Sequence, residues 1–329
     1  MDYHKIYTQV LDINGCSTPR IGMRKSGSRE FVCGCSSFEK RELIKKLYSL
    51  ENAENFNRAF DEVTQGPGKE LRRITTLHSS SLLGLLVFYD VSENNPAIIN
   101  GVKYTRTFFE VKNKAFASAS SVDVVLVSQD KANILFLELK FTEFLNTCPY
   151  YWLKKDYHEL YNKISKLLNN AGILVSEMKE RQHRHRNKSV TSSHEFKIED
   201  ASQSRRYFHG IKQMISHLIS VMQSPATNYI ELRKLIDAAP KPHILLGTML
   251  YKHSGTFLHE FEDYYRLYKE IFAQENINQI VNSIRGCSNI VAEYEVELLP
   301  IPLTYQNDLK GECGDFHINE QVRNFYKLV

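Results

Sequence analysis

The sequence predicts an α/β fold in which helices pack on a sheet. Two observations carry this prediction: short apolar or alternating runs typical of strands recur along the chain, and longer runs with helical periodicity separate them. Strands interleaved with helices are typical of an α/β sandwich. Hydrophobic residues make up 42% of the 329 residues and charged residues 24%, which suffices for a substantial core and excludes a disordered or fibrous chain.

The first 75 residues are expected to form an elaboration that precedes the core. Leucine and isoleucine recur at helical spacing over residues 39–50, and Gly66-Pro67-Gly68 indicates a turn. A second helix is predicted over residues 79–91, because serines that can cap a helix precede an apolar run. The core is then predicted to occupy residues 76–255.

Within this core, strand and helix patterns alternate. Strands are expected over residues 102–104, 107–111, 121–127, 134–141 and 242–251, and helices over residues 150–168 and 205–223. The polar stretch 177–204 lacks this periodicity, so we expect a loop there, within an insertion near residues 142–204. Residues 256–329 are expected to pack on the core as a C-terminal elaboration, with a helix over 260–284 and an alternating strand over 289–299.

Composition excludes several classes of protein. The longest apolar run, residues 82–89, is far short of the roughly 20 residues that span a bilayer. The N-terminus lacks the basic-then-apolar pattern of a signal peptide, so we expect a cytoplasmic protein with no membrane partner. No Gly-x-x-x-x-Gly-Lys-Ser/Thr motif is present, and nucleotide triphosphate is therefore not an expected partner.

The six cysteines are scattered along the chain, which favours free thiols over a disulfide framework. Cys16, Cys33 and Cys35 could supply three ligands of a zinc site. No Cys-x-x-Cys or histidine pair at the usual spacing completes the four ligands, so free thiols are the preferred interpretation.

Positive charge is concentrated in residues 179–188, which hold five Lys or Arg residues and one Glu. The net charge of the whole chain is only +4, so the remainder is neutral on balance. The basic run either contacts phosphates or is a solvated loop. For the first alternative, the candidate nucleic-acid-binding residues are Arg181, Arg184, Arg186 and Lys188, together with Arg206 further along the chain.

Two charged residues interrupt an apolar strand pattern over residues 134–141. With a period of two, Glu138 and Lys140 share one face with Ile134 and Phe136. A strand this apolar is expected to be buried, and buried charges are costly unless they are paired or bind a metal ion. The alternative is an exposed hairpin on which Glu138 and Lys140 merely form an ion pair.

Hairpin register adds a second carboxylate. If residues 128–133 form the loop, Val127 pairs with Ile134 and Asp123 falls opposite Glu138, with Cβ atoms roughly 4.5–5.5 Å apart. Two carboxylates this close repel each other unless a divalent cation lies between them, and oxygen ligands suit Mg²⁺, for which Mn²⁺ can substitute. Lys140 could then orient or help to deprotonate a water, or stabilise a charged transition state. The pattern predicts phosphodiester hydrolysis.

Asp123 and Glu138-Leu139-Lys140 resemble the motif of the PD-(D/E)XK nuclease superfamily, which has the restriction-endonuclease-like fold. Val122 stands where the motif has proline. The order of features is most similar to an uncharacterised bacterial restriction-endonuclease-like group, and the resemblance covers roughly residues 77–250. The features are Leu77-His78-Ser79-Ser80, Phe109-Glu110, the run 138–143 and the run 207–213.

This resemblance implies a three-layer α/β/α sandwich with a central mixed sheet, and Mg²⁺-dependent cleavage of DNA in restriction or another defence role. Glu110 would be an additional acidic metal ligand beside Asp123 and Glu138, and Gln213 would approach from a later helix. Double-strand cleavage usually needs two active sites, which a homodimer would supply. Two rivals stay open: a catalytically silent nuclease-like domain that binds nucleic acid or serves assembly, and an RNA nuclease.

Two further features allow two interpretations each. Gln213 lies opposite the apolar stripe of its helix, beside Arg206 and His217, on a face that either is solvated or lines a DNA groove. Tyr150-Tyr151-Trp152 could stack on bases, although aromatic residues next to an apolar helix are more often core.

Overall fold

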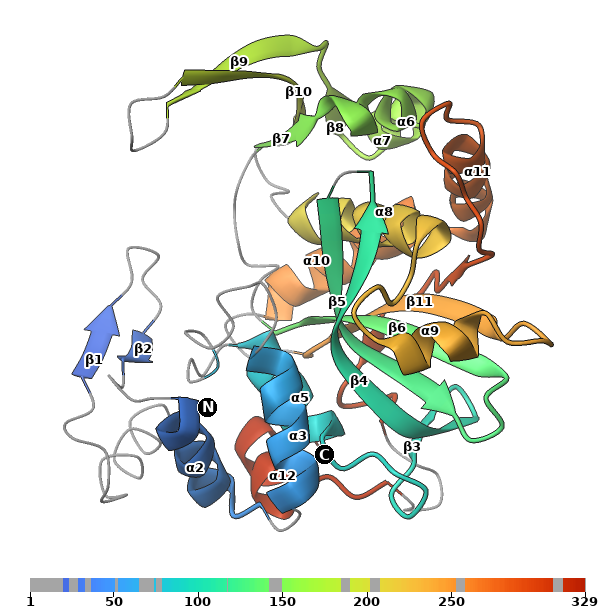
Figure 1. The fold of residues 1–329 in the computed structure, drawn as a ribbon. Helices are drawn as coiled ribbons and strands as arrows, with labels where there is room; N and C mark the ends of the chain where they lie inside the picture. Colours follow the sequence, from blue (N-terminus) through green and yellow to red (C-terminus); the bar gives the residue numbers. More distant parts are fainter. Residues whose placement is uncertain are drawn as a thin grey trace.

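The chain forms a mixed α/β structure (Figure 1). The computed structural model describes residues 20–23, 29–32, 37–50, 53–64, 74, 79–116, 118–141, 150–184, 190–201, 208–252, 258–309 and 316–328. Near the N-terminus, β1 (Arg20–Met23) and β2 (Arg29–Val32) pair in a two-stranded sheet. The candidate zinc ligands Cys16, Cys33 and Cys35 lie outside the described residues.

The central sheet has seven strands in the order β12-β11-β6-β5-β4-β3, with β13 also paired to β11. Its strands are β3 (Ala97–Ile99), β4 (Val102–Ala115), β5 (Ser118–Ser128), β6 (Asn133–Lys140), β11 (His243–Leu250), β12 (Glu297–Leu298) and β13 (Leu303–Thr304). Strands β3 to β6 are antiparallel, whereas β11 runs parallel to β6 and pairs in parallel with β12 and β13. The predicted α/β class and mixed sheet are confirmed.

Helices pack against both faces of this sheet (Figure 1). On one face lie α2 (Ser37–Tyr48), α3 (Ala53–Thr64), α5 (Ser80–Phe88) and α12 (Glu320–Tyr326). On the other lie α8 (Phe208–Gln223), α9 (Ile230–Ile236), α10 (Leu258–Ile271) and α11 (Gln274–Arg285). A Cβ at Gly84 would lie 2.1 Å from Leu139 Cδ1. Glycine at this position therefore lets α5 approach β6 closely, beside Glu138 and Lys140.

A second, four-stranded sheet forms where we expected a loop. It consists of β7 (Tyr150–Lys154), β8 (Ile173–Val175), β9 (Lys179–Arg184) and β10 (Val190–Asp200), all antiparallel, and β10 pairs with the other three. The prediction of a loop over residues 177–204 is therefore wrong. Phe196 and Ile198 of β10 are buried, which anchors the sheet, while the charged residues alternate with them.

Two helix predictions also change at their boundaries. The helix expected over residues 150–168 begins only at α6 (His158–Lys163), which is followed by α7 (Ser165–Asn170), because β7 precedes it and is joined to it by a 3₁₀ turn (Lys155–Tyr157). The single helix expected over 260–284 is divided into α10 and α11.

The C-terminal strand is shorter than expected. Alternate residues of the segment 289–299, including Ile290, Tyr294 and Leu298, are buried as predicted, but only Glu297 and Leu298 pair with β11. Cys287, which shortly precedes this segment, is a buried free thiol. In the part of the chain that the structure describes, no helix is long and apolar enough to cross a membrane.

Candidate functional site

Strands β4 and β5 are irregular at the level of Glu110 and Asp123. The ladder pairs on either side are Phe109 with Val124 and Val111 with Val122, which leaves Glu110 and Asp123 between them outside the regular ladder. The first pair belongs to the hydrophobic cluster on the α5 side of the sheet, and the second to the cluster on the α8 side. Glu110 also has a positive φ of 48°. Both strands thus change face at these two carboxylates, and such irregularities occur often next to functional sites.

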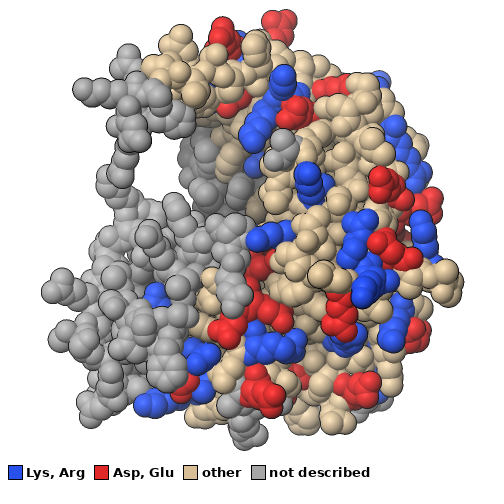
Figure 2. All heavy atoms as spheres, in the orientation of Figure 1, with Lys and Arg blue, Asp and Glu red and all other residues tan. Residues whose placement is uncertain are grey.

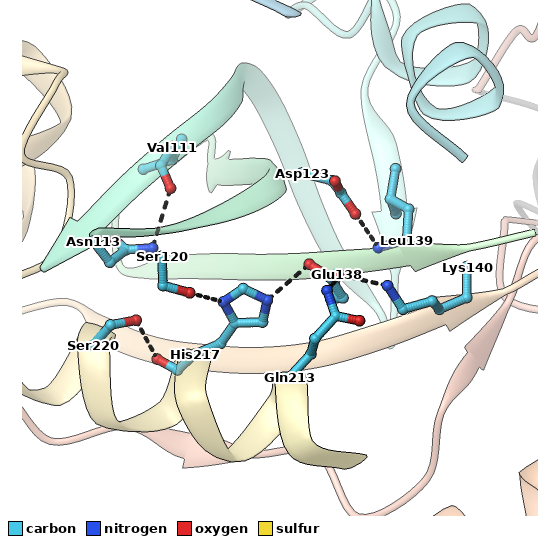
Figure 3. A network of polar contacts seen from close by, with 10 residues as sticks. All are labelled: Val111, Asn113, Ser120, Asp123, Glu138, Leu139, Lys140, Gln213, His217 and Ser220. Carbon is cyan, nitrogen blue, oxygen red and sulfur yellow. Dashed lines mark hydrogen bonds and ion pairs between the residues drawn. The ribbon is translucent and has the colours of Figure 1, made fainter. Parts of the chain in front are cut away.

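The register predicted for β5 and β6 is confirmed. Val127 pairs with Ile134, and the ladder continues to Val124 and Leu137. At the next level, where Asp123 would meet Glu138, regular pairing ends. Asp123 Oδ2 instead accepts a hydrogen bond from the backbone N–H of Leu139 at 2.7 Å (Figure 3).

Glu138 and Lys140 are buried, with only 3% and 5% of their surfaces exposed. Lys140 Nζ donates a hydrogen bond to Glu138 Oε1 at 2.5 Å. The alternative of an exposed hairpin is therefore wrong, although the two side chains do form an ion pair. A charged pair in this setting loses much hydration, and its members depend on each other.

Helix α8 brings two more side chains to Glu138. Gln213 Nε2 donates a hydrogen bond to Glu138 Oε1 at 3.1 Å, so Gln213 approaches as expected from the later helix. His217, one turn further along, places Nε2 3.0 Å from Glu138 Oε2, and its Nδ1 lies 2.7 Å from Ser120 Oγ (Figure 3). His217 was not among the predicted site residues. The available signal was its spacing of four from Gln213, which puts both on one side of the helix.

The pKa values of the two central carboxylates are shifted in opposite directions. Burial, with the charges of Glu138 and Glu110, raises the pKa of Asp123 well above its usual range, although Lys140 and the Leu139 N–H act in the opposite direction. Burial also opposes ionisation of Glu138, but Lys140 and His217 lower the pKa of Glu138 to about 2. Glu138 is therefore ionised at neutral pH, whereas Asp123 lacks an adequate counter-charge.

The donor chemistry of this pair fits a magnesium ion. Mg²⁺ prefers oxygen ligands, keeps several waters and is commonly bound through one or two carboxylates. Asp123 and Glu138 form such a set, and a cation would supply the charge that Asp123 lacks. Among the described residues, no group of three His, Cys, Asp or Glu side chains is placed to hold a metal ion. The charge of Glu110 raises the pKa of Asp123, so the two carboxylates are near each other. Among the described residues, however, Glu110 does not complete a group of three metal ligands with Asp123 and Glu138.

Glu62 is an acidic side chain near this site that the sequence did not reveal. Its Oε2 accepts a hydrogen bond from the Phe109 N–H at 3.2 Å, next to the irregular position of β4. Burial raises the pKa of Glu62. Nothing in the local sequence of α3 marks this residue, because its partner is far away along the chain.

The predicted basic run is only partly within the described residues. Arg181 lies on β9, donates a hydrogen bond to Glu195 Oε2 at 3.0 Å and places its guanidinium carbon 4.1 Å from the ring centroid of Trp152. Arg184 is the last residue of β9, whereas Arg186, Lys188 and Arg206 lie outside the described residues. Basic and acidic side chains are interspersed over the face in Figure 2.

The three aromatic residues at the start of β7 point in two directions. Tyr150 is 42% exposed, and Lys197 Nζ lies 4.5 Å from its ring centroid. Tyr151 packs against the hydrophobic cluster on the α8 side of the central sheet. The core interpretation therefore fits Tyr151 but not Tyr150.

Comparison with known proteins gives no relative. No family model, no curated protein and no solved structure matches this chain.

Proposed function

We propose that this protein is a metal-dependent nuclease that hydrolyses DNA phosphodiester bonds, as a restriction-type or other defence-associated endonuclease. The observation that carries the proposal is the buried pair of Glu138 and Lys140 on a central strand, with Asp123 on the adjacent strand. Two buried charged groups and a half-buried carboxylate beside them are costly in an apolar sheet, and a metal-binding hydrolytic site accounts for all three.

The fold supports the same proposal. Helices α3 and α5 on one face and α8 on the other enclose the strands that carry the site, which is compatible with a three-layer α/β/α sandwich of the restriction-endonuclease-like type. The order Asp123, Glu138, Lys140, Gln213 places two carboxylates and the lysine on consecutive strands and the glutamine on a later helix. This is the arrangement that the PD-(D/E)XK resemblance implies.

In this proposal Asp123 and Glu138 hold the divalent cation. When bound, the cation supplies positive charge to the phosphate and makes a water more acidic. Lys140 is held by Glu138, so its ammonium is fixed in place to stabilise negative charge that develops on the phosphate. His217 holds the second oxygen of Glu138 and is itself held by Ser120.

Gln213 has a separate part in the proposed mechanism. Its Nε2 is engaged by Glu138, while its Oε1 is buried and has no hydrogen-bond partner within the described residues. A buried acceptor without a partner is costly. We assign Gln213 Oε1 the task of accepting a hydrogen bond from a water at the site and so orienting that water.

Incubation of the purified protein with supercoiled plasmid and Mg²⁺, with EDTA as the control, tests the proposal. We expect nicked or linear plasmid with Mg²⁺ and intact plasmid with EDTA or with Lys140→Ala. Binding of plasmid without cleavage under any divalent metal would favour the catalytically silent module. Cleavage of an RNA substrate alone would assign the site to an RNA nuclease.

A further inference from the structure

A second lysine lies beside the candidate site on α8. Lys212 directly precedes Gln213, is half-buried, and places its ammonium 5.5 Å from the ring centroid of Tyr151. No carboxylate forms an ion pair with Lys212 within the part of the chain that the structure describes. This distinguishes Lys212 from Arg181 and Lys197 of the second sheet, which pair with Glu195 and Glu199.

The positive charge of Lys140 also acts on Lys212. Burial and the charge of Lys140 both lower the pKa of Lys212. Glu138 pairs with Lys140, and among the described residues it forms no ion pair with Lys212. Two ammonium groups, those of Lys140 and Lys212, therefore act on each other at this edge of the site. An anion placed there would offset both the repulsion and the lost hydration.

We infer that Lys212 and Lys140 together bind the non-bridging oxygens of one phosphate group of the substrate, with Tyr151 covering the Lys212 side chain. Ammonium groups bind phosphate as compact point charges, and two of them match the charge spread over its oxygens. In naming a nucleic-acid phosphate, the inference rests on the proposed nuclease function. It adds a residue that fixes the position of the substrate backbone relative to the two carboxylates.

The test compares Lys212→Met with Lys234→Met. Lys234 is an exposed lysine of α9, and both substitutions remove one charge. Binding of a labelled DNA duplex is followed by fluorescence anisotropy in EDTA over a series of salt concentrations. We expect Lys212→Met to weaken binding about tenfold, which corresponds to a loss of about 1.4 kcal/mol in binding free energy. The slope of log affinity against log salt should also fall by about 0.9, the value for one duplex phosphate contact.

Lys234→Met should keep both the affinity and the slope, and Lys212→Arg should retain most of the binding because it keeps the charge. Removal of a half-buried ammonium next to Lys140 should leave the melting temperature unchanged or higher. If Lys212→Met folds poorly, Lys212→Gln replaces it in the same series. Wild-type affinity and slope in a folded, uncharged variant would overturn the inference.

A second probe separates this inference from the proposed function. Inorganic phosphate is titrated into the wild-type protein and the Lys212→Met variant, and binding is followed by ³¹P NMR. Phosphate binding that Lys212→Met weakens supports the anion site even if no nucleic acid is cleaved, in which case only the nuclease proposal fails. If plasmid is cleaved but phosphate binds equally to both proteins, the anion site is wrong and the nuclease proposal stands.

Discussion

The central sheet and the second sheet both carry charged side chains on their strands, but the two sheets differ in how these charges are paired and how deeply they are buried. On β9 and β10, Arg181 pairs with Glu195 at 3.0 Å, and both side chains are partly exposed. On β5 and β6, Glu138 and Lys140 are buried among apolar residues, Asp123 beside them is half-buried, and the pKa of Asp123 is raised. The contrast shows that a high density of charge along the sequence does not predict buried charge, whereas charge within an apolar strand does.

Free energy explains this difference. An exposed ion pair contributes about 0–1 kcal/mol, because water solvates its members nearly as well when they are apart. Removal of one partner from a buried pair costs about 3–5 kcal/mol, because the other charge is left unpaired. The members of the buried pair therefore depend strongly on each other, whereas those of the partly exposed pairs in the second sheet depend on each other much less.

The largest expected effect is that of Glu138→Ala. This substitution leaves Lys140 buried without its carboxylate, so we expect the free energy of unfolding to fall by about 3 kcal/mol or more. The matched variant is Glu199→Ala, which removes the exposed partner of Lys197 and should cost less than about 1 kcal/mol. Urea denaturation of both variants measures the difference. Equal losses would show that the two sheets do not differ as described.

Lys140→Ala is expected to separate catalysis from binding. The rate of plasmid cleavage should fall about 100-fold or more, because the fixed ammonium acts on charge that develops in the transition state. DNA affinity should fall only about tenfold, as for Lys212→Met, since one lysine is a small part of a surface that contacts several phosphates. Lys197→Ala, in the second sheet, is the control for loss of one charge. Equal losses of rate and affinity for Lys140→Ala would assign Lys140 to phosphate binding alone.

Asp123→Asn should change how stability depends on pH. The pKa of Asp123 is raised in the folded state, so the protonated group favours folding, and this contribution is lost as the pH rises from about 4 through the folded pKa. Without metal, Asp123→Asn should therefore gain about 1.4 kcal/mol at pH 7 for each unit by which that pKa is raised. Urea denaturation in EDTA between pH 4 and pH 8 measures it, and parallel curves for the two proteins would contradict the raised pKa.

Glu138 should show the opposite dependence on pH. Its folded pKa is about 2, so its ionised form stabilises the protein above the ordinary pKa of glutamate, and this contribution is lost only as the pH falls towards 2. The buried pair should thus remain intact across the range in which Asp123 titrates, which keeps the two contributions separable in one pH series.

The smallest expected effects belong to the basic run. Neutralisation of Arg181, Arg184, Arg186 and Lys188 together should weaken DNA binding similarly for all sequences, and it should lower the salt slope by about 0.9 for each phosphate that the protein no longer binds. Arg181→Gln alone should change the slope little, because Glu195 already neutralises Arg181. Salt-titrated anisotropy on the two variants measures this. An unchanged slope in the quadruple variant would show that the run does not contact DNA.

Local patterns were enough to predict part of the site. Period-two alternation placed Glu138 and Lys140 on one face, and the length of the hairpin loop gave the register of β5 and β6. Helical periodicity brought Gln213 to the polar side of α8, where it contacts Glu138. Each of these rests on residues near one another in the chain or on one regular element.

The rest depends on contacts that no local pattern contains. Glu62 accepts a hydrogen bond from the Phe109 N–H although it lies on a separate helix. The charge of Lys140 lowers the pKa of Lys212 only because α8 packs on the central sheet. Strands β9 and β10 were missed because their exposed faces are polar, and the buried residues of β10 are too few to give a clear period. The gap in the β4–β5 ladder at Glu110 and Asp123 likewise has no counterpart in the local sequence pattern.

Calorimetric titration with Mn²⁺ tests the central claim most directly, because it asks whether the buried carboxylates hold a divalent cation. Wild-type protein, Asp123→Asn and Glu199→Gln are compared at pH 7. We predict that the wild type and Glu199→Gln bind Mn²⁺ alike, and that Asp123→Asn, which should fold at least as stably, loses this binding. Unchanged Mn²⁺ binding by Asp123→Asn would contradict the assignment of Asp123 and Glu138 as a metal site.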